Sequence, residues 1–572
     1  MRLLSIVALL SNRWWLAAGG GIALGLAFPK SHLASLAWIG PVIILFSAMG
    51  RTGGEAFRLG YVAGIVQSLI ALRWLLYIPF PVGAVAGWLA LSLYLGLYTG
   101  LWVWLSWHFF PNKTPPPLAP RLNRETAIWF GATPWKQRIA WVFLVAVYWV
   151  GNEMVTARFL SGFPWLGVGI TQSEFLPLIQ ISSLTGVYGV SFLVVWFSVS
   201  AISATTVLIA HPYRRKGWLI DLIFPMSGIL VAVVYGFQFL IRDGVPTTTA
   251  NLALVQPSIP QTLIWDVAEN KSRFQKLIDL SELALATKPD LLIWPEAAVP
   301  TMLRHDPETA NAVKTLLGKH NAWAVVGSDD ADVGDSGTSK DARYYNSSFA
   351  INPSGAIEGI YRKRRLVIFG EYIPLLNWFP FLRHLTPIGE NGFSAGEKPV
   401  SFYTPSRDGK HRISLSPMIC FEDAFPQSVR EYVHADTDFL LNLTNDGWFG
   451  ESNAQWQHAF HAVFRAVENR VPVVSCANNG LTCWVDPLGR MHEVYWGTTA
   501  NIYGAGFKTV PVPILSGEKR VMTFYHDYGD VFGWGCTALW AVALSQAFLQ
   551  MKRYRRRSHV EPSLIPSQVI RP

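Results

Sequence analysis

The sequence predicts a polytopic α-helical membrane domain of about eight spans, joined to an α/β domain outside the bilayer. The chain of 572 residues is 51% hydrophobic and only 15% charged, whereas charged residues make up about a quarter of an ordinary globular chain. The shortage of charge lies before residue 240 and near the C-terminus. Between these regions, short β-rich runs alternate with helical patterns, as is typical of a layered α/β domain.

Apolar stretches of about 17–25 residues match the thickness of a bilayer core. The candidate spans are 13–29, 32–50, 59–80, 83–110, 138–156, 186–210, 218–241 and 531–551. The first ten residues resemble the start of a signal peptide, but no small-residue cleavage site follows, so we expect this segment to be retained. Gly19, Gly20 and Gly21 follow no strand and precede no Lys-Ser/Thr, so they indicate close helix packing rather than a phosphate loop.

The basic residues gather in short loops between the spans. They include Arg214, Arg215, Lys216, Lys552, Arg553, Arg555, Arg556 and Arg557. Lysine and arginine mark the cytoplasmic side of a membrane protein, so the net charge of +9 indicates topology rather than nucleic-acid binding. With a cytoplasmic N-terminus, the basic loops 51–58, 111–137 and 211–217 all fall inside, and seven crossings place 242–530 outside.

These features predict the domain boundaries. We expect a seven-span domain at 1–241, an extracytoplasmic domain at 242–520, a C-terminal transmembrane helix with a basic tail at 521–557, and a flexible tail at 558–572. In the extracytoplasmic domain, strands are predicted at 252–256, 291–294, 322–327, 347–352, 413–419, 439–443 and 471–477. Helices are predicted at 271–287, 308–319 and 454–469, and the turn at 352–355 indicates a hairpin.

Three candidate catalytic residues each follow an apolar run: Glu296, Lys363 and Cys420. Reactive groups gather beyond the carboxyl ends of strands in open α/β sheets. A carboxylate can take the thiol proton, while an ammonium lowers the thiol pKa and stabilises an oxyanion. The three residues therefore predict acyl transfer through a thioester. The alternatives are a buried apolar cysteine, a capping glutamate and a solvated lysine.

Other residues leave simpler alternatives open. His458 and His461 have the i, i+3 spacing of a metal pair, but no third ligand is near in sequence and no metal is expected. Cys476 and Cys483 can form a local disulfide, although the signal is weak, and Cys420 is expected to be unpaired. The aromatic loop 157–185, with Trp165, is either an interfacial anchor or a wall for a lipid chain.

The motifs around the candidate residues resemble a known superfamily. Trp294-Pro295-Glu296, Tyr361-Arg362-Lys363 and Cys420-Phe421-Glu422 occur in this order. The pattern resembles the nitrilase superfamily, whose Glu-Lys-Cys triad lies on an αββα sandwich. Among its members, the chain is similar to the apolipoprotein N-acyltransferase family, which has the same layout of seven spans, a nitrilase-like domain and a last span. The matching segments are 162–165, 255–257 with Trp265, 363–374, 445–450, 464–470 and 478–480.

The resemblance implies roles for nine residues. Glu296 would be the general base, Cys420 the nucleophile and Lys363 the oxyanion partner. Glu371 and Glu422 would support the site. The substrate-binding residues would be Trp265, Phe421 and Trp448, which line a lipid pocket, and Trp165 at its membrane mouth. The aromatic residues can equally be core, and Glu422 a structural ion-pair partner. Ile368 replaces a proline usual in the family, Phe421 a frequent tyrosine, and the insert at 111–137 has no functional account.

The resemblance also implies a reaction and a location. An acyl chain would pass from a membrane phospholipid, through a cysteine thioester, to the N-terminal amine of an S-diacylglyceryl-cysteine apolipoprotein, completing lipoprotein maturation. No cofactor, metal or nucleic acid would take part. We expect a monomer in the bacterial inner membrane, with a periplasmic catalytic domain and cytoplasmic termini. The alternatives are a membrane-tethered nitrilase-type amidohydrolase and a non-catalytic transporter or receptor, although the spans carry few of the charges that transport requires.

Overall fold

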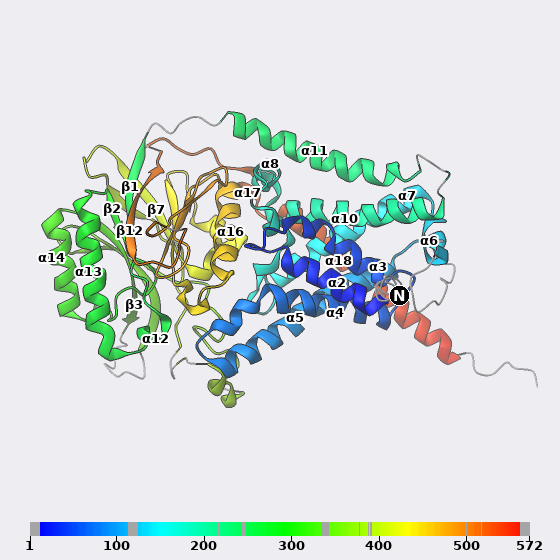
Figure 1. Ribbon diagram of the computed structural model, residues 1–572, viewed down its shortest axis with the longest axis horizontal. Helices are drawn as coiled ribbons and strands as arrows, with labels where there is room; N and C mark the ends of the chain where they lie inside the picture. Colours follow the sequence, from blue (N-terminus) through cyan, green and yellow to red (C-terminus); the bar gives the residue numbers. More distant parts are fainter. Residues whose placement is uncertain are drawn as a thin grey trace, which may run out of the picture.

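The chain folds into a helical bundle and an α/β sandwich that lie end to end (Figure 1). The computed structural model describes residues 12–112, 124–211, 213, 217–242, 248–332, 342–376, 378–386, 388, 392–498, 500–515 and 517–560. Residues 1–11, 113–123, 212, 214–216 and 561–572 are among those outside this description. The predicted N-terminal segment, part of the loop at 111–137, most of the loop at 211–217 and most of the tail at 558–572 therefore lie outside it.

Five helices are long and apolar enough to cross a membrane, by length and composition. They are α5 (Pro81–His108), α7 (Trp135–Thr156), α10 (Val187–Ala210), α11 (Leu219–Ile241) and α18 (Val531–Val560, apolar through Arg553). They confirm the last five predicted spans. The first three predicted spans are also helical but shorter: α2 (Arg13–Leu26), α3 (Gly40–Ser47) and α4 (Gly54–Ala71). The count of eight spans therefore stays a prediction.

The short helices are explained by their local sequence. The span predicted at 32–50 opens with a 3-10 turn, Ala34–Trp38, and Pro41 at the start of α3 begins a new helix. The helix α4 ends at Ala71 and is followed by a second 3-10 turn, Arg73–Tyr77. Hydropathy alone does not distinguish a continuous helix from an apolar run divided in this way.

Glycine permits close helix packing at the start of the bundle, as the sequence indicated. A Cβ on Gly21 would lie 2.3 Å from the backbone oxygen of Ala63 in α4. A Cβ on Gly64 would lie 2.6 Å from the Thr99 hydroxyl in α5. Small residues let helix backbones approach each other within a membrane, so α2, α4 and α5 pack closely.

A buried ion pair joins three helices of the bundle. Arg138 of α7 donates from Nε and Nη2 to the Asp221 carboxylate of α11, at 3.1–3.2 Å. The Ser203 hydroxyl of α10 donates to Asp221 Oδ2 at 2.9 Å. Both charged side chains are almost fully buried. Buried charges are costly unless they are paired, so this contact fixes how the three helices meet.

The α/β domain contains two six-stranded sheets. The first has the order β12-β1-β2-β3-β4-β5, with β1 (Thr249–Gln256), β2 (Leu291–Ile293), β3 (Trp323–Asp332), β4 (Arg343–Ile351), β5 (Ile357–Arg362) and β12 (Gly506–Pro513). The second has the order β11-β10-β9-β8-β7-β6, with β6 (Phe402–Pro405), β7 (Arg412–Ile419), β8 (Phe439–Thr444), β9 (Val473–Ala477), β10 (Cys483–Val485) and β11 (Met491–Glu493). Contacts of β1 with β9 and of β4 with β7 show that the sheets face each other.

Helices cover the outer faces of the two sheets. The helices α13 (Asn270–Ala286) and α14 (Pro307–His320) lie on the far side of the first sheet, and α16 (Ala454–Asn469) lies between the second sheet and the bundle (Figure 1). The seven predicted strands and three predicted helices are confirmed. The strand β5 is the second strand of the hairpin indicated at 352–355, and the sequence analysis missed β6, β10, β11 and β12. The first three have only three or four residues, and β12 is interrupted by prolines.

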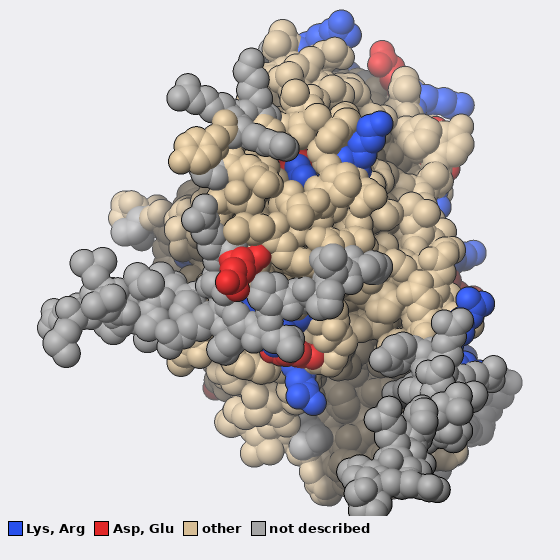
Figure 2. All heavy atoms as spheres, turned by 90° about the vertical axis from the view of Figure 1, so that its right-hand side faces the viewer, with Lys and Arg blue, Asp and Glu red and all other residues tan. Residues whose placement is uncertain are grey.

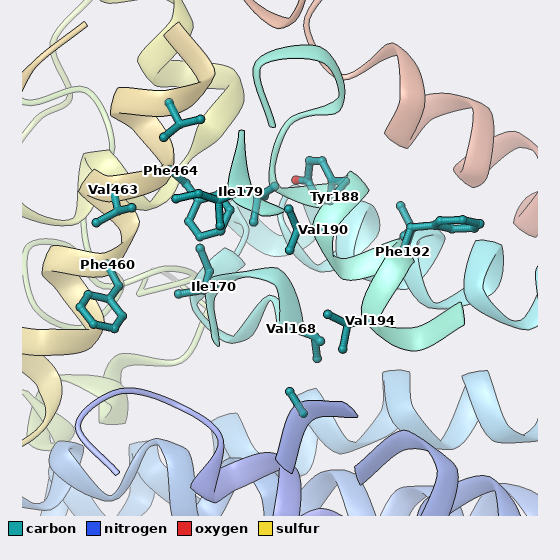
Figure 3. Close-up of a cluster of buried hydrophobic side chains, with 14 of the residues drawn as sticks. Val168, Ile170, Ile179, Tyr188, Val190, Phe192, Val194, Phe460, Val463 and Phe464 are labelled. Carbon is teal, nitrogen blue, oxygen red and sulfur yellow. The ribbon is translucent and has the colours of Figure 1, made fainter. Parts of the chain in front are cut away.

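The helix α16 joins the two parts through an apolar interface. Phe460, Val463 and Phe464 of α16 face Ile170, Ile179, Tyr188 and Val190 of the bundle (Figure 3). On the same helix, Arg465 pairs with Glu468 at 2.8 Å, and Glu468 Oε1 accepts a hydrogen bond from the Val187 amide at the start of α10. The orientation of the α/β domain on the bundle is therefore fixed by both packing and hydrogen bonding.

Among the described residues, the end of the bundle that points away from the α/β domain has a mostly uncharged surface (Figure 2). Figure 2 shows this end as mostly uncharged surface with scattered Lys and Arg side chains and fewer acidic ones. This distribution is compatible with the cytoplasmic side expected for the bundle, and the orientation itself stays a prediction.

Replacing Asp221 by alanine should destabilise the bundle, because it leaves the Arg138 guanidinium buried without its partner. We expect a loss of about 3–5 kcal/mol, measured by denaturant titration of the protein in detergent micelles. The double replacement Arg138→Met/Asp221→Leu removes both charges and should recover most of the loss. Equal destabilisation of the single and double variants would contradict this account.

Candidate active site

Cys420 lies where the strand β7 passes into a 3-10 turn, Cys420–Ala424. Its φ angle of +54° lies in the left-handed region, which is uncommon for a residue with a side chain. The Cys420 carbonyl accepts hydrogen bonds from Asn442 Nδ2 and His458 Nε2, both at 3.1 Å. Backbone strain of this kind persists only where surrounding contacts hold it, so the position of the thiol is imposed by its neighbours.

Glu296, Lys363 and Glu371 form one buried charged cluster. Lys363 follows β5, and its Nζ lies 3.4 Å from Glu296 Oε1 and 2.9 Å from Glu371 Oε1. Asn346 Nδ2 donates to the same two oxygens, at 2.7 and 3.0 Å. Burial alone would lower the pKa of Lys363, but Glu371 and Glu296 raise it well above its usual value. Lys363 therefore stays cationic inside the protein.

The Cys420 thiol experiences the charges of this cluster. Burial, followed by Glu296, raises its pKa to about 12, while Lys363 and His458 act in the opposite direction. The thiol is consequently protonated near neutral pH and needs a base before it can attack. The arrangement offers a carboxylate as proton acceptor and an ammonium that can stabilise negative charge on sulfur or oxygen.

Glu422 binds backbone groups on both sides of the site. Its Oε1 accepts from the amides of Arg364 and Arg365 at 2.7 and 3.0 Å. Its Oε2 accepts from the Ile419 amide at 2.8 Å and the Tyr361 hydroxyl at 2.6 Å. This carboxylate links the segment after Lys363 to the end of the strand that carries Cys420, so its contacts are those of a positioning residue.

Two groups of aromatic residues lie around the site. Trp165 is buried, and its ring centroid lies 5.8 Å from that of Phe421 and 5.5 Å from that of Trp74. Trp265 and Trp448 form a separate edge-to-face pair, 5.3 Å apart, in which Trp265 is 44% exposed. Because Trp165 is covered by protein, it is not itself an exposed headgroup anchor.

The structure answers the question of a disulfide, while the two interpretations of the loop 157–185 stay predictions. Phe159 and Leu160, in the same loop as Trp165, are exposed and can contact lipid. All four cysteines are unpaired. The strand register pairs Cys483 with Ser475 rather than with Cys476, so the neighbouring residue Cys476 points to the other face of the sheet.

The sequence analysis missed a buried group next to the thiol. His458 of α16 lies between two carboxylates, with Nδ1 2.9 Å from Asp446 and Nε2 3.2 Å from Asp423. Ligand atoms of Cys420, Asp446 and His458 lie within 4.8 Å of one another, and His461 is not part of this group. Burial would lower the pKa of His458, but Asp423 and Asp446 raise it well above its usual value. A protonated imidazole donates from both ring nitrogens, so His458 can bond to the carboxylates on either side of it.

Comparisons with known proteins place the chain in a family. Residues 20–200 match the apolipoprotein N-acyltransferase N-terminal domain, and residues 251–502 match the carbon-nitrogen hydrolase family. An apolipoprotein N-acyltransferase from Geobacter metallireducens is 34% identical over 92% of this chain and 94% of the relative. The chain belongs to the apolipoprotein N-acyltransferase family.

A second relative carries the same name. The apolipoprotein N-acyltransferase of Chlorobaculum tepidum is 28% identical over 93% of this chain and 96% of its own length. The predicted membership of the apolipoprotein N-acyltransferases and of the nitrilase superfamily is confirmed. The roles of the nine predicted site residues stay predictions.

The pH dependence of thiol alkylation should report the charge of Glu296. Glu296→Gln removes a negative charge that raises the pKa of Cys420. The pH at which the rate of reaction with iodoacetamide increases should therefore be lower than in the parent protein. Lys363→Met removes a charge that lowers this pKa, so its profile should move to higher pH.

The alkylation rates would be followed by intact mass in a protein whose other cysteines, Cys476, Cys483 and Cys536, are replaced by alanine. Cys420→Ala in this background measures alkylation at sites other than Cys420. A profile that moves to higher pH in Glu296→Gln would contradict the arrangement of charges described here.

Glu422→Gln should destabilise the protein, because one carboxylate oxygen that faces backbone donors becomes an amide donor. We expect a loss of about 2–3 kcal/mol in denaturant titrations in detergent. The matched control is Glu431→Gln, which alters a half-exposed pair with Arg364 and should cost no more than about 0.5 kcal/mol. Equal effects of the two replacements would refute the positioning role of Glu422.

Proposed function

We propose that this chain transfers an acyl chain from a membrane phospholipid to the N-terminal amine of an S-diacylglyceryl-cysteine apolipoprotein, through a thioester on Cys420. Membership of the apolipoprotein N-acyltransferase family supports the reaction class. The observation that carries the residue assignment is the buried cluster of Glu296, Lys363 and Glu371, whose charges act on the Cys420 thiol.

In the first half-reaction, Glu296 takes the thiol proton as the Cys420 sulfur attacks the ester carbonyl of the phospholipid. The Lys363 ammonium stabilises the oxyanion of the tetrahedral intermediate. The bond between the carbonyl carbon and the glycerol oxygen then breaks, and Glu296 returns its proton to that oxygen. Lysophospholipid leaves, and the acyl chain remains on sulfur as a thioester.

In the second half-reaction, the uncharged amine of the lipoprotein attacks the thioester carbonyl. Glu296 accepts a proton from the attacking nitrogen, and Lys363 again stabilises the oxyanion. The carbon–sulfur bond breaks, the thiolate recovers the proton from Glu296, and the product is an amide. Donor and acceptor therefore use one site in turn, as in a ping-pong mechanism.

The surroundings of the site favour transfer between lipids over amide hydrolysis. The segment after Lys363 exposes Leu375, Trp378 and Phe381. Exposed apolar clusters of this kind mark membrane or partner contacts. Both substrates reside in the bilayer, and a lipid-facing entrance lets them reach the thiol without crossing water. Trp265 and Phe421 are proposed to contact the acyl chain, with Trp165 and Trp448 behind them.

The family and the apolar helices identify a protein of the inner membrane. We further propose that the α/β domain lies on the periplasmic side, that both termini are cytoplasmic, and that the chain acts as a monomer. The distribution of basic residues among the predicted loops supports this orientation. The reaction steps above require only the residues of this chain and its two lipid substrates.

The thioester is the feature that an experiment can detect directly. Purified protein incubated with phosphatidylethanolamine should gain the mass of one acyl chain, and a diacylated lipopeptide with a free amine should remove it. Cys420→Ala should gain none, and Glu296→Gln should form the adduct at least about a hundredfold more slowly.

The control for the acid is Glu431→Gln, which alters an exposed carboxylate and should acylate at the parent rate. Absence of an adduct on the parent protein, or an unchanged adduct on Cys420→Ala, would eliminate the proposed mechanism.

A further inference from the structure

A cavity of about 90 Å³ lies where the bundle meets the α/β domain. Its polar lining comes from four helices, with Gln67 of α4, Tyr98 of α5, Asn152 and Glu153 of α7, and His461 of α16. Cavities with room for water and several polar partners are normally occupied. This volume is sufficient for a small polar group or a few water molecules.

Five side chains that line the cavity have polar atoms with no hydrogen-bond partner in the described part of the chain, and two of them are Tyr188, through its hydroxyl, and Arg465, whose Nε faces Glu468 in an ion pair. The other three offer acceptors, which are Asn152 Oδ1, Glu153 Oε2 and the ring nitrogens of His461. Asn152 is 6% exposed and His461 is 1% exposed. Buried polar atoms are nearly always hydrogen-bonded, so three such side chains around one cavity indicate a ligand.

Glu153 carries the negative charge of the cavity. Its Oε1 accepts from Trp149 Nε1 at 2.7 Å and from the Val168 amide at 2.8 Å, and the Ser191 hydroxyl lies close to the carboxylate. Among the described residues, no lysine, arginine or histidine forms an ion pair with it.

The cations nearest to the cavity already have carboxylate partners. Arg465, which also lines the cavity, pairs with Glu468 at 2.8 Å. Arg158, just beyond the end of α7, pairs with Asp530. Burial, Arg465 and His458 hold the pKa of His461 well below its usual value, so His461 is neutral and can accept a hydrogen bond. The cavity is therefore left with one carboxylate that lacks a counter-charge.

We infer that this cavity binds a primary ammonium group. An ammonium has three N–H donors, and the cavity presents three matching acceptors in Glu153 Oε2, Asn152 Oδ1 and a ring nitrogen of His461. The rings of Trp102, Trp149 and Tyr188 also line it, and aromatic faces attract cations. A phosphate would instead meet the uncompensated carboxylate and be repelled.

The cavity is separated from the nucleophile by one layer of aromatic side chains. Phe163, which lines the cavity, lies 6.0 Å from Phe421, the residue after Cys420. Trp165 lies 4.9 Å from His461 on the other side of that layer. Tyr188 and Ile170 lie beside α16 at this junction (Figure 3). A lipid that reaches Cys420 can therefore have its charged end nearby.

This inference rests on the proposed function to identify the source of the ammonium. The ethanolamine headgroup of a phospholipid donor carries such a group, whereas the α-amine of the lipoprotein acceptor must reach the thioester on Cys420 uncharged. The alternative is that Glu153 only anchors the loop 164–172 through Oε1 while the cavity holds water. Glu153→Gln separates these accounts, because a glutamine keeps the carbonyl acceptor for Trp149 and Val168 but removes the charge.

The test compares Glu153→Gln with Glu174→Gln, which alters an exposed acid in the same outer segment, in full-length protein reconstituted in nanodiscs. We expect Glu153→Gln to raise the KM for phosphatidylethanolamine by about tenfold, the loss expected for a charged hydrogen bond. The KM for phosphatidylglycerol and for the diacylated lipopeptide should not change. A rise for the lipopeptide alone would contradict the assignment.

Unchanged KM values in Glu153→Gln, or equal losses with phosphatidylethanolamine and phosphatidylglycerol, would overturn the inference and leave a water-filled cavity. A second readout does not depend on catalysis. In the Cys420→Ala background, phosphatidylethanolamine should raise the thermal unfolding midpoint more than phosphatidylglycerol does, and Glu153→Gln should abolish that difference. Failure of the proposed function would appear separately, as a parent protein that forms no acyl adduct.

Discussion

The burial of one ammonium group, that of Lys363, determines the rest of the catalytic cluster. A cation 1% exposed is stable only with carboxylates around it, and Glu296 and Glu371 supply them. Two acids around one base leave an excess of negative charge. That excess contributes to the high pKa of the Cys420 thiol and, together with burial, raises the pKa of Asp329 to about 7. The site therefore favours states that hold an additional proton, which suits a thiol that is deprotonated only as it attacks.

The helix α16 connects this chemistry to the membrane part of the molecule. On one side, His458 donates to the Cys420 carbonyl and lies between Asp423 and Asp446. On the other side, Phe460, Val463 and Phe464 pack against the bundle. One helix thus contacts the backbone of Cys420 in its left-handed conformation and fixes the position of Cys420 relative to the helical bundle.

The three catalytic candidates were predictable because each one directly follows a segment whose apolar pattern indicates a strand. Glu296 and Lys363 follow β2 and β5 of the first sheet, and Cys420 follows β7 of the second sheet, which faces the first. Reactive groups gather beyond the carboxyl ends of such strands. His458 was not predictable in the same way, because its contacts with Cys420 and Asp446 depend on how α16 lies across the second sheet. The strand β12 was missed for a related reason. Its partner β1 lies about 250 residues earlier, and two prolines obscure the pattern.

Two acidic residues of the helical bundle, Asp221 and Glu153, differ in how completely their carboxylates are hydrogen-bonded. Asp221 is fully compensated by Arg138 and Ser203, so its contacts account for its presence in the bundle. Glu153 has donors on one oxygen and none on the other, beside a cavity that other side chains with unpartnered polar atoms also line. An acid needed only to anchor a loop would be served equally well by glutamine, without the cost of burying a charge. The carboxylate is more readily explained by a positively charged group that binds in the cavity.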